Sequence, residues 1–490
     1  MADSDGLEIG VHCLCRSHNF SVSLPTSQLP LAASCCHCNE CRHLTGGMYT
    51  CAVEWPGPPE SILGASLQRY KYAKSSVLMF CGTCGTPMFA HKSTEGEAPD
   101  VFYVAAGLLP NLNVDLVKLT DHFWVGDTLD GGASVYMQNL NGNSQPIPRW
   151  RKSRGEVGGL LDGDWPSQVS CQERIAKASS HGSVRIQCVC KGVDFTLWRD
   201  NNGFSELKAQ DKLAAWVNPT TLKPVAAYDA CNSCRFMVGV PIMHWTFARV
   251  AQLGFASGNL DPKGFPANTP DLKAAVKAGK DGRFGTLTFY ESSPDVQRYY
   301  CSRCSASVFY AVDDLPDQVD IAMGLLHAPE GSRAESWVEW EWGGLGHNDD
   351  TIGGWREDFG KAIQAESEGW RVAKEHDLDL VSRAYEQGVA GSLQVIAAAN
   401  ILCRSAAPVA IQGLQKLVPC RLTSNTRRPL ASAAPRKDTT KLSGWELQDS
   451  AHRRASDWYL HANSPIFSSP TAANRPGRQP PSTLCIQTAH

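Results

Sequence analysis

The sequence has no long hydrophobic run. A helix that spans a membrane needs about 18 uninterrupted apolar residues, and the nearest candidate, residues 393–414, is broken by Asn400 and Arg404. The first ten residues, MADSDGLEIG, contain neither a basic cluster nor an apolar core, so we expect no secretory signal peptide. We therefore predict a protein with no membrane partner that works in a reducing compartment, the cytoplasm or alternatively the nucleus.

The sequence also lacks a strong net charge. Its 490 residues carry 46 Lys and Arg against 49 Asp and Glu, a formal charge of -3, so no global field points to nucleic acid as a partner. The charge is unevenly distributed, because residues 401–490 hold 12 Lys and Arg against 4 Asp and Glu, whereas the preceding 400 residues hold 34 against 45. Aromatic residues are not regularly interleaved in the basic segment, so we expect a solvated tail rather than a nucleic-acid-binding one.

Cysteine is abundant, and it occurs in close pairs. Nineteen cysteines would suggest disulfides in a small secreted chain, but CxC and CxxC pairs in a chain of 490 residues favour metal binding. Three thiols, Cys36, Cys38 and Cys41, lie within six residues. Zinc takes four protein ligands in a structural site, and three plus an exchangeable position in a catalytic site. Because Cys35 directly precedes Cys36, and the side chain of His37 points to the opposite face of an extended segment, the three thiols predict an open zinc site.

Two more cysteine pairs lie on either side of these thiols, Cys13 with Cys15 upstream and Cys81 with Cys84 downstream. Together they supply the four ligands of a closed structural zinc site, and such a site can contribute on the order of 10 kcal/mol to folding. A competing assignment joins one of the thiols at 36, 38 or 41 to these pairs in a single site, but it leaves other thiols unexplained.

The order of these motifs resembles one family. A CxC is followed by CHCxxCR at residues 36–42, by Gly46 and Gly47, and by FCGxCG at residues 80–85. This arrangement is similar to that of the glutathione-dependent formaldehyde-activating enzyme family, which also includes centromere protein V. The resemblance implies a mainly β fold of the Mss4-like group, zinc as the cofactor, and carbon-sulfur lyase activity with a thiol such as glutathione. It further implies structural zinc ligands at Cys13, Cys15, Cys81 and Cys84, and catalytic zinc ligands at Cys36, Cys38 and Cys41.

The cysteine pattern then returns, which indicates a tandem repeat. Cys188 with Cys190 repeats the first pair at an offset of 175, residues 229–235 repeat CHCxxCR at an offset of 193, and Cys301 with Cys304 repeats the last pair at an offset of 220. The growing offset means inserted residues near 199–223 and 257–284, where we expect surface loops. The four repeated cysteines predict a second structural zinc site.

The second copy departs from the first at the proposed catalytic triad. Asp229 replaces the first thiol and Ala230 replaces the histidine, so the candidate ligands are Asp229, Cys231 and Cys234. A carboxylate oxygen can bind zinc, so a fourth, mixed-ligand zinc site and a metal-free remnant both stay open. CSRCS replaces CGTCG at residues 301–305, so we expect the glycine turn to be lost. We favour the first copy as the catalytic one.

The fold is predicted to be mainly β. Short segments rich in branched and aromatic residues, such as 101–106, favour strands. Together with the resemblance, this predicts two tandem Mss4-like zinc-binding domains, a C-terminal helix and a disordered tail. The expected limits are 9–140 for the first zinc domain, 141–182 for a linker, 183–355 for the second zinc domain, 356–400 for a helical extension and 401–490 for the basic, disordered tail.

The chemistry follows from the ligand set. Three thiolates leave bound zinc with a net negative charge, so the metal activates water weakly but suits an incoming thiol as its fourth ligand. The resemblance implies that this thiol adds to formaldehyde or a related small electrophile, or is released from it. Candidate acid-base groups are His37, Glu40, Arg42, His122 and Asp127, each of which is also explained as an exposed charge or a buried structural residue. Arg42 has the best claim to bind substrate, because arginine suits the carboxylates of a peptide-like thiol.

Two other classes of function remain. A zinc-stabilised binding or scaffold protein, a role that centromere protein V illustrates for this family, would not need a complete open triad. A lyase, isomerase or dehydratase acting on a larger natural product would need an apolar pocket. Trp124, Trp245 and Trp340 are candidates to line it, although aromatic residues of this kind lie more often in a core.

Overall fold

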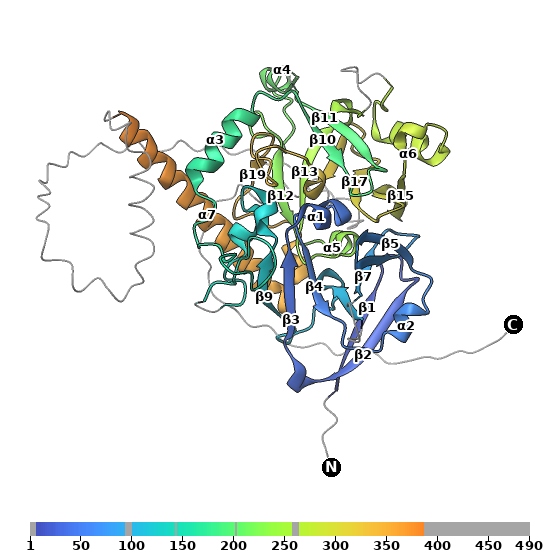
Figure 1. Ribbon diagram of the computed structural model, residues 1–490. Coiled ribbons are helices and arrows are strands. Elements are labelled where there is room, and N and C mark those ends of the chain that lie inside the picture. The colour runs from blue at the N-terminus through green and yellow to red at the C-terminus, as the bar shows by residue number, and fades with distance from the viewer. Residues whose placement is uncertain (1–5, 94–99, 143–144, 201–202, 257–263, 387–490) are drawn as a thin grey trace, which may run out of the picture. The chain divides into compact units, whose positions relative to one another are not determined.

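The computed structural model describes residues 6–93, 100–142, 145–200, 203–256 and 264–386, all within one compact unit, Met1–Leu442. The predicted tail at 401–490 and the end of the predicted helical extension lie outside the described residues. The described chain is mainly β, as the sequence predicts, with two sheets of seven strands each (Figure 1).

The first large sheet has the strand order β5-β6-β7-β8-β4-β3-β9. Its strands are β3 (Leu31–Cys36), β4 (Thr50–Glu54), β5 (Gln68–Ala73), β6 (Ser76–Phe80), β7 (Pro87–Lys92), β8 (Val101–Ala105) and β9 (Val117–Phe123). Neighbouring strands are antiparallel except β3 and β9. In β8, Phe102 and Val104 are buried while Val101, Tyr103 and Ala105 are only half-buried, which is the alternation expected of a strand with one face on the core.

The second large sheet has the corresponding order, β15-β16-β17-β18-β13-β12-β19, again with a single parallel pair at its end. Its strands are β12 (Val225–Asp229), β13 (Met243–Arg249), β15 (Leu287–Ser293), β16 (Val296–Cys301), β17 (Ser307–Val312), β18 (Gln318–Ala322) and β19 (Glu339–Trp340). The same topology therefore occurs twice along the chain. The domain limits given above stay predictions.

Smaller elements complete the two halves. A hairpin of β1 (Gly6–His12) and β2 (Asn19–Pro25) precedes the first sheet, and β10 (Ser183–Gln187), β11 (Asp194–Trp198) and β14 (Leu253–Phe255) form a three-stranded sheet in the second half. The helices before the last one are α1 (Asn39–Thr45), α2 (Glu60–Leu63), α3 (Gln168–Ala178), α4 (Gly203–Ala209), α5 (Asn232–Val238) and α6 (Thr269–Ala278). Helix α3 lies in the predicted linker, and α4 and α6 lie in segments expected to be plain loops.

The two halves touch through a reciprocal backbone contact. The short turns η2 (Ala106–Leu108) and η7 (Met323–Leu325) each meet the C-terminal end of the other half's helix. The amide of Gly107 donates to the carbonyl of Gly239 at 3.0 Å, and the amide of Gly324 donates to the carbonyl of Gly46, also at 3.0 Å. A Cβ at Gly107 would lie 2.4 Å from a backbone nitrogen, and one at Gly324 would lie 2.1 Å from a carbonyl oxygen. Only glycine permits so close an approach.

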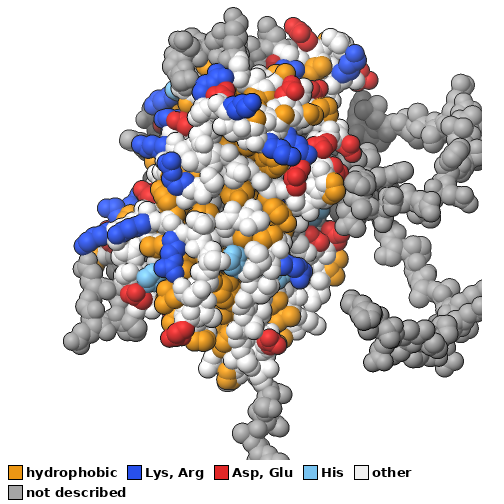
Figure 2. All heavy atoms as spheres, turned by 90° about the vertical axis from the view of Figure 1, so that its right-hand side faces the viewer, with side chains coloured by type: hydrophobic (Ala, Val, Ile, Leu, Met, Phe, Trp, Pro, Cys, Tyr) orange, Lys and Arg blue, Asp and Glu red, His pale blue; other side chains and the backbone are white. Residues whose placement is uncertain are grey.

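Helix α7 (Trp355–Glu386) packs its first turns against both halves. The backbone amide and the indole of Trp355 donate to carbonyls of Leu112 and Pro110 at 3.0 Å each, while the buried Arg356 donates to carbonyls of the second half. Phe359 and Ile363 belong to the core. Among the described helices, none combines the length and the apolar composition of a transmembrane span. On the face seen in Figure 2, side chains of both charge signs occur together.

Candidate metal centres

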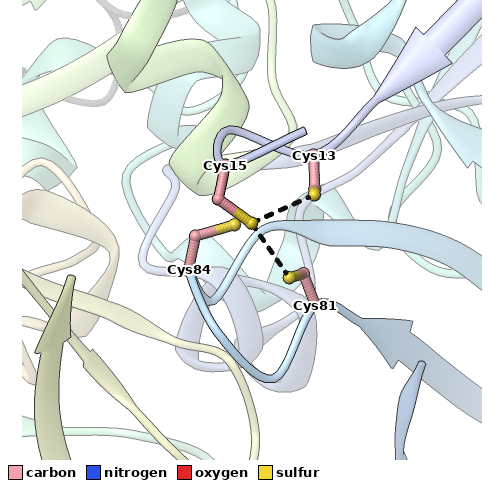
Figure 3. Close-up of side chains that lie close together, drawn as sticks. All are labelled: Cys13, Cys15, Cys81 and Cys84. Carbon is pink, nitrogen blue, oxygen red and sulfur yellow. Dashed lines mark hydrogen bonds between the residues drawn. The ribbon is translucent and has the colours of Figure 1, made fainter. Parts of the chain in front are cut away.

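The first cysteine quartet joins two turns. Cys13 and Cys15 follow β1, and Cys81 and Cys84 follow β6. Their four sulfur atoms lie within 4.8 Å of one another and converge on one point (Figure 3). The Cys13–Cys15 and Cys15–Cys81 sulfur pairs are 3.5 and 3.6 Å apart. A tetrahedral zinc with four sulfur ligands at about 2.3 Å requires sulfur atoms about 3.8 Å apart, so this donor set fits a structural zinc.

The second quartet has the same geometry. The sulfur atoms of Cys188 and Cys190 are 3.5 Å apart, those of Cys190 and Cys301 are 3.4 Å apart, and Cys304 completes the group. The expected loss of the turn after this pair is wrong, because Ser305 adopts a φ of 73°, close to the 75° of Gly85 at the equivalent position. The buried Ser305 hydroxyl donates to the Gly85 carbonyl at 2.6 Å, a bond between the two halves that accompanies the strained backbone.

The first triad lies where β3 passes into α1. Cys36 ends the strand, Cys38 caps the helix by accepting a hydrogen bond from the amide of Cys41 at 3.3 Å, and Cys41 lies in the first turn. The three sulfur atoms lie within 4.8 Å of one another, with no fourth His, Cys, Asp or Glu ligand grouped with them among the described residues. Three sulfur donors fit zinc, and a set of three is the number that a catalytic zinc uses.

Two histidines support this segment from the interior. His37 is fully buried, and its Nε2 lies 3.0 Å from Nδ1 of His122, whose own Nε2 lies 2.8 Å from the Met137 carbonyl. Because a carbonyl only accepts, His122 donates to Met137 and His37 donates to His122. Burial lowers the pKa of His122 to about 4 and lowers the pKa of His37 well below its usual range. Both rings are therefore neutral structural groups near pH 7.

Arg42 is the unusual residue beside the first triad. The interpretation of Arg42 as an exposed charge is wrong, because its side chain is only 4% exposed. One terminal nitrogen donates to the side-chain oxygen of Asn39, but Nε and the other terminal nitrogen are buried with no hydrogen-bond partner among the described residues. Burial lowers its pKa, which the carboxylate of Asp130 and the nearby thiols partly oppose. A buried guanidinium with unused donors is costly, so this arrangement suits an incoming anion.

The other charged candidates differ in their surroundings. Glu40 is exposed in the first turn of α1. Asp127 accepts a hydrogen bond from the amide of Asn39 at 3.2 Å, and burial raises its pKa. Cys35 is completely buried, and burial raises the pKa of its thiol well above the usual range. It is accounted for as a core thiol.

The second triad is embedded in a network of charges. The ligand atoms of Asp229, Cys231 and Cys234 lie within 4.8 Å of one another. Oδ1 of Asp229 accepts from the amide of Cys231 at 2.9 Å and lies 3.1 Å from Nδ1 of His347, while Oδ2 accepts from the Trp245 indole at 3.1 Å. The hydrogen bond that His347 donates to Asp229 raises the pKa of His347 to about 9, although burial opposes this shift.

A buried arginine lies against the same triad. A terminal nitrogen of Arg298 donates to Sγ of Cys234 at 3.4 Å, and its guanidinium lies over the ring of Tyr310. Neither Arg298 nor His347 was predicted from the sequence. The repeat could have identified Arg298, because it occupies the position of Leu78 in the first half. Arg298 pairs with Tyr310 between β16 and β17, and Leu78 pairs with Ala90 between β6 and β7. A charge thus replaces an apolar residue at an interior position.

Two of the three tryptophan candidates lie in the core, whereas Trp124 is half-buried. Trp245 and Trp340 are 4% and 5% exposed and belong to the core. A cavity of about 100 Å³ borders Trp340, with Lys223, Glu335 and Lys374 also in its wall and no triad residue lining it. Sites for drug-sized ligands typically measure about 300–1,000 Å³, so this cavity is too small for a large natural product.

Comparison with known proteins found a match to the first half of the chain. Residues 8–127 match the sequence model of the glutathione-dependent formaldehyde-activating enzyme family. Neither the curated proteins nor the solved structures contain a significant match to the chain. The matched range contains the first quartet, the first triad and Asp127, and it excludes the second sheet, so that a second copy of this family follows stays a prediction. Residues 8–127 are therefore similar to the glutathione-dependent formaldehyde-activating enzyme family.

Proposed function

We propose that this protein is a zinc-dependent enzyme of the carbon-sulfur lyase type. In the proposed reaction a thiol such as glutathione adds to formaldehyde or a related small electrophile. A sulfur-carbon bond forms, the carbonyl oxygen takes up the thiol proton, and the reverse reaction cleaves the same bond. The observation that carries the proposal is the grouping of Cys36, Cys38 and Cys41 without a fourth protein ligand among the described residues.

The residues of the first half would have separate roles. Cys36, Cys38 and Cys41 would hold the metal from one side and leave one coordination position for the substrate sulfur. A zinc ion held by these three thiolates would supply a lower pKa for a thiol bound to it. The buried pair His37 and His122 would keep the strand that carries Cys36 in place from the opposite side. Their low pKa values suit a structural role better than proton transfer.

Arg42 would bind the anionic part of the thiol substrate. It follows Cys41 directly, it is buried, and two of its nitrogens have no partner among the described residues. A carboxylate is the group that best uses paired guanidinium donors. The equivalent arginine of the second half, Arg235, already donates to Asn232 at 2.8 Å and to the carbonyl of Leu109 at 3.0 Å. Arg235 therefore has less capacity for a ligand than Arg42.

The test combines metal content with thiol binding in the full chain. Cys38→Ala is expected to lose one zinc equivalent and to lose binding of glutathione, measured by calorimetry on the zinc-loaded protein. Cys35→Ala is the matched control, because Cys35 is adjacent in sequence but buried away from the triad. If Cys38→Ala keeps all its zinc, the triad assignment is wrong. If the wild type retains its zinc but binds no glutathione at millimolar concentration, the thiol reaction is wrong and a scaffold role is favoured.

A further inference from the structure

A second pair of thiols occupies the place of the catalytic triad in the second sheet. We propose that Cys231 and Cys234 form a metal-free dithiol that is reversibly oxidised to a disulfide by low-molecular-weight disulfides. This proposal does not rest on the reaction proposed for the first half, since it concerns different residues and a different chemistry.

The two triads occupy equivalent positions in the fold. In the first half, the amide of Asn39 donates to Asp127 at 3.2 Å, and in the second half the amide of Asn232 donates to Asp350 at 2.7 Å. The triads are thus framed by the same contact between a helix start and a closing turn. The start of each triad-bearing helix is therefore held by an aspartate of the following turn in both halves.

Three replacements change the charge of the second site together. Cys36 becomes Asp229, Leu78 becomes Arg298, and Trp124, which precedes the turn η3 (Val125–Thr128), becomes His347, which precedes η8 (Asn348–Thr351). The first triad has no basic side chain at the Leu78 position, so a bound metal would supply the positive charge there. The second triad has Arg298 against one thiol and His347 against the carboxylate. It therefore carries its own positive group, the guanidinium of Arg298.

Arg298 and Asp229 are both committed to this network. Arg298 is 6% exposed, and a buried guanidinium is stable only when its charge is paired. Its contact with Cys234 at 3.4 Å supplies part of that pairing. Asp229 accepts bonds from Trp245, His347 and the amide of Cys231, which use three of the roughly four lone-pair directions of a carboxylate. The donor set thus fits a metal-free ion-pair network better than a zinc site.

The two remaining sulfur atoms suit thiol-disulfide exchange. Cys231 directly precedes α5 and is partly exposed, whereas Cys234 is 5% exposed, and the two sulfur atoms lie within 4.8 Å of each other. The thiolate of Cys231 attacks one sulfur of the small disulfide, forming a mixed disulfide and releasing one thiolate. Cys234 then attacks the Cys231 sulfur, forming the internal disulfide and releasing the second thiol. The protein dithiol loses two electrons and two protons, and the small disulfide gains them. Arg298 is placed to stabilise negative charge on Cys234 in the second step.

The first experiment uses the zinc-loaded full chain and glutathione disulfide. The peptide containing residues 231–234 is expected to lose two hydrogen masses, with no release of zinc. Cys35 and Cys51 provide an internal control, because they face each other across β3 and β4 but are completely or almost completely buried, so this pair is expected to stay reduced. If residues 231 and 234 stay reduced, or are oxidised only as zinc is released, the proposal is overturned.

The second experiment compares zinc content. The double variant Cys231→Ser with Cys234→Ser is expected to bind as much zinc per chain as the wild type, and loss of one equivalent would show a metal site instead. Conversely, Asp229→Cys combined with Arg298→Leu restores two features of the first triad and is expected to gain one zinc equivalent. An unchanged circular dichroism spectrum shows that this variant is folded. If the folded variant gains no zinc, the charges of the second site do not replace a metal.

Discussion

The two seven-stranded sheets share a strand order but not a triad. Both halves have a four-cysteine cluster at the same two turns, and in both a short helix begins directly after the first strand of the large sheet along the chain, β3 or β12. The triads beside those helices differ in one ligand and in two neighbouring side chains, Leu78 against Arg298 and Trp124 against His347. The comparison teaches that the cysteines that can stabilise the fold are independent of those that can do chemistry. A half can change its triad and keep its quartet.

The largest effect on stability is expected at the four-cysteine clusters, which both halves have. Cys84→Ser and Cys304→Ser each remove one ligand from a quartet, and a structural zinc contributes on the order of 10 kcal/mol, which is comparable to the whole stability of a domain. Each variant is expected to lose one zinc and to unfold, as measured by metal analysis and thermal denaturation. Cys171→Ser is the control, because Cys171 is buried in α3 outside both quartets. A folded, zinc-depleted variant would contradict the structural role of that quartet.

The next largest effect, on the rate of the proposed reaction, is expected to differ between the two triads. Cys41→Ala is expected to lower the rate of thiol addition by about 100-fold or more, since even residues that only support metal ligands are typically worth about 10- to 100-fold. Cys234→Ala, at the equivalent position, is expected to leave that rate within about twofold. Steady-state kinetics on both variants measure the contrast. An equal loss of activity would mean that the second triad also takes part in the reaction.

Stability is expected to depend on pH with opposite sign in the two halves. The pKa of His347 is raised to about 9 by Asp229, so its contribution is complete below the unfolded pKa of about 6.5 and is lost as the pH rises through 9. The pKa of His122 is lowered to about 4, mainly by burial, so its contribution is complete above about 6.5 and is lost as the pH falls toward 4. Each effect is on the order of 1 to 3 kcal/mol.

Denaturant titrations between pH 4 and 9 on two variants check this prediction. His347→Gln is expected to flatten the alkaline decline in the free energy of unfolding, and His122→Gln is expected to flatten the acid decline. If His347→Gln changes only the acid limb, the ion pair with Asp229 does not set the alkaline behaviour.

The smallest expected effect separates the two equivalent arginines. Arg42→Gln is expected to weaken glutathione binding by roughly 10-fold, the value of about one charge-assisted hydrogen bond, with little loss of stability because two of its nitrogens are unpaired in the free protein. Arg235→Gln should instead lower the thermal midpoint, because its guanidinium bonds the carbonyls of Gly107 and Leu109. Calorimetric titration and thermal denaturation of both variants are the measurements. Equal effects on binding would remove the special role of Arg42.

Local spacing predicted which thiols form each close pair, and the ligand count of zinc together with the resemblance joined the distant pairs into quartets. CxC and CxxC pairs hold their thiols at one turn whatever the rest of the chain does, and the repeat indicated that the second half would follow the first. The mainly β class was also predicted from short segments rich in branched and aromatic residues. The structure brings together all four predicted groups, including Asp229 with Cys231 and Cys234.

Other contacts between distant residues were not predicted. His347 meets Asp229 across more than a hundred residues, and the burial of Arg42 does not follow from its local sequence. The Ser305 turn was expected to be lost because only glycine adopts a positive φ easily, yet the serine keeps that conformation and bonds to Gly85. Helix α4 forms in a segment whose polar composition suggested a loop. In each case a contact made by the folded chain outweighs the local preference.

The glycine contacts between the halves give the second half a structural role whatever its triad does. Gly324 rests on the turn that ends α1, and Gly107 rests on the turn that ends α5, so each triad-bearing helix is braced by its counterpart. Deleting the second half would leave the helix that carries Cys41 without this support. Substitutions at residues 229, 298 and 347 do not touch these glycine contacts, whereas residues 107 and 324 admit no larger side chain.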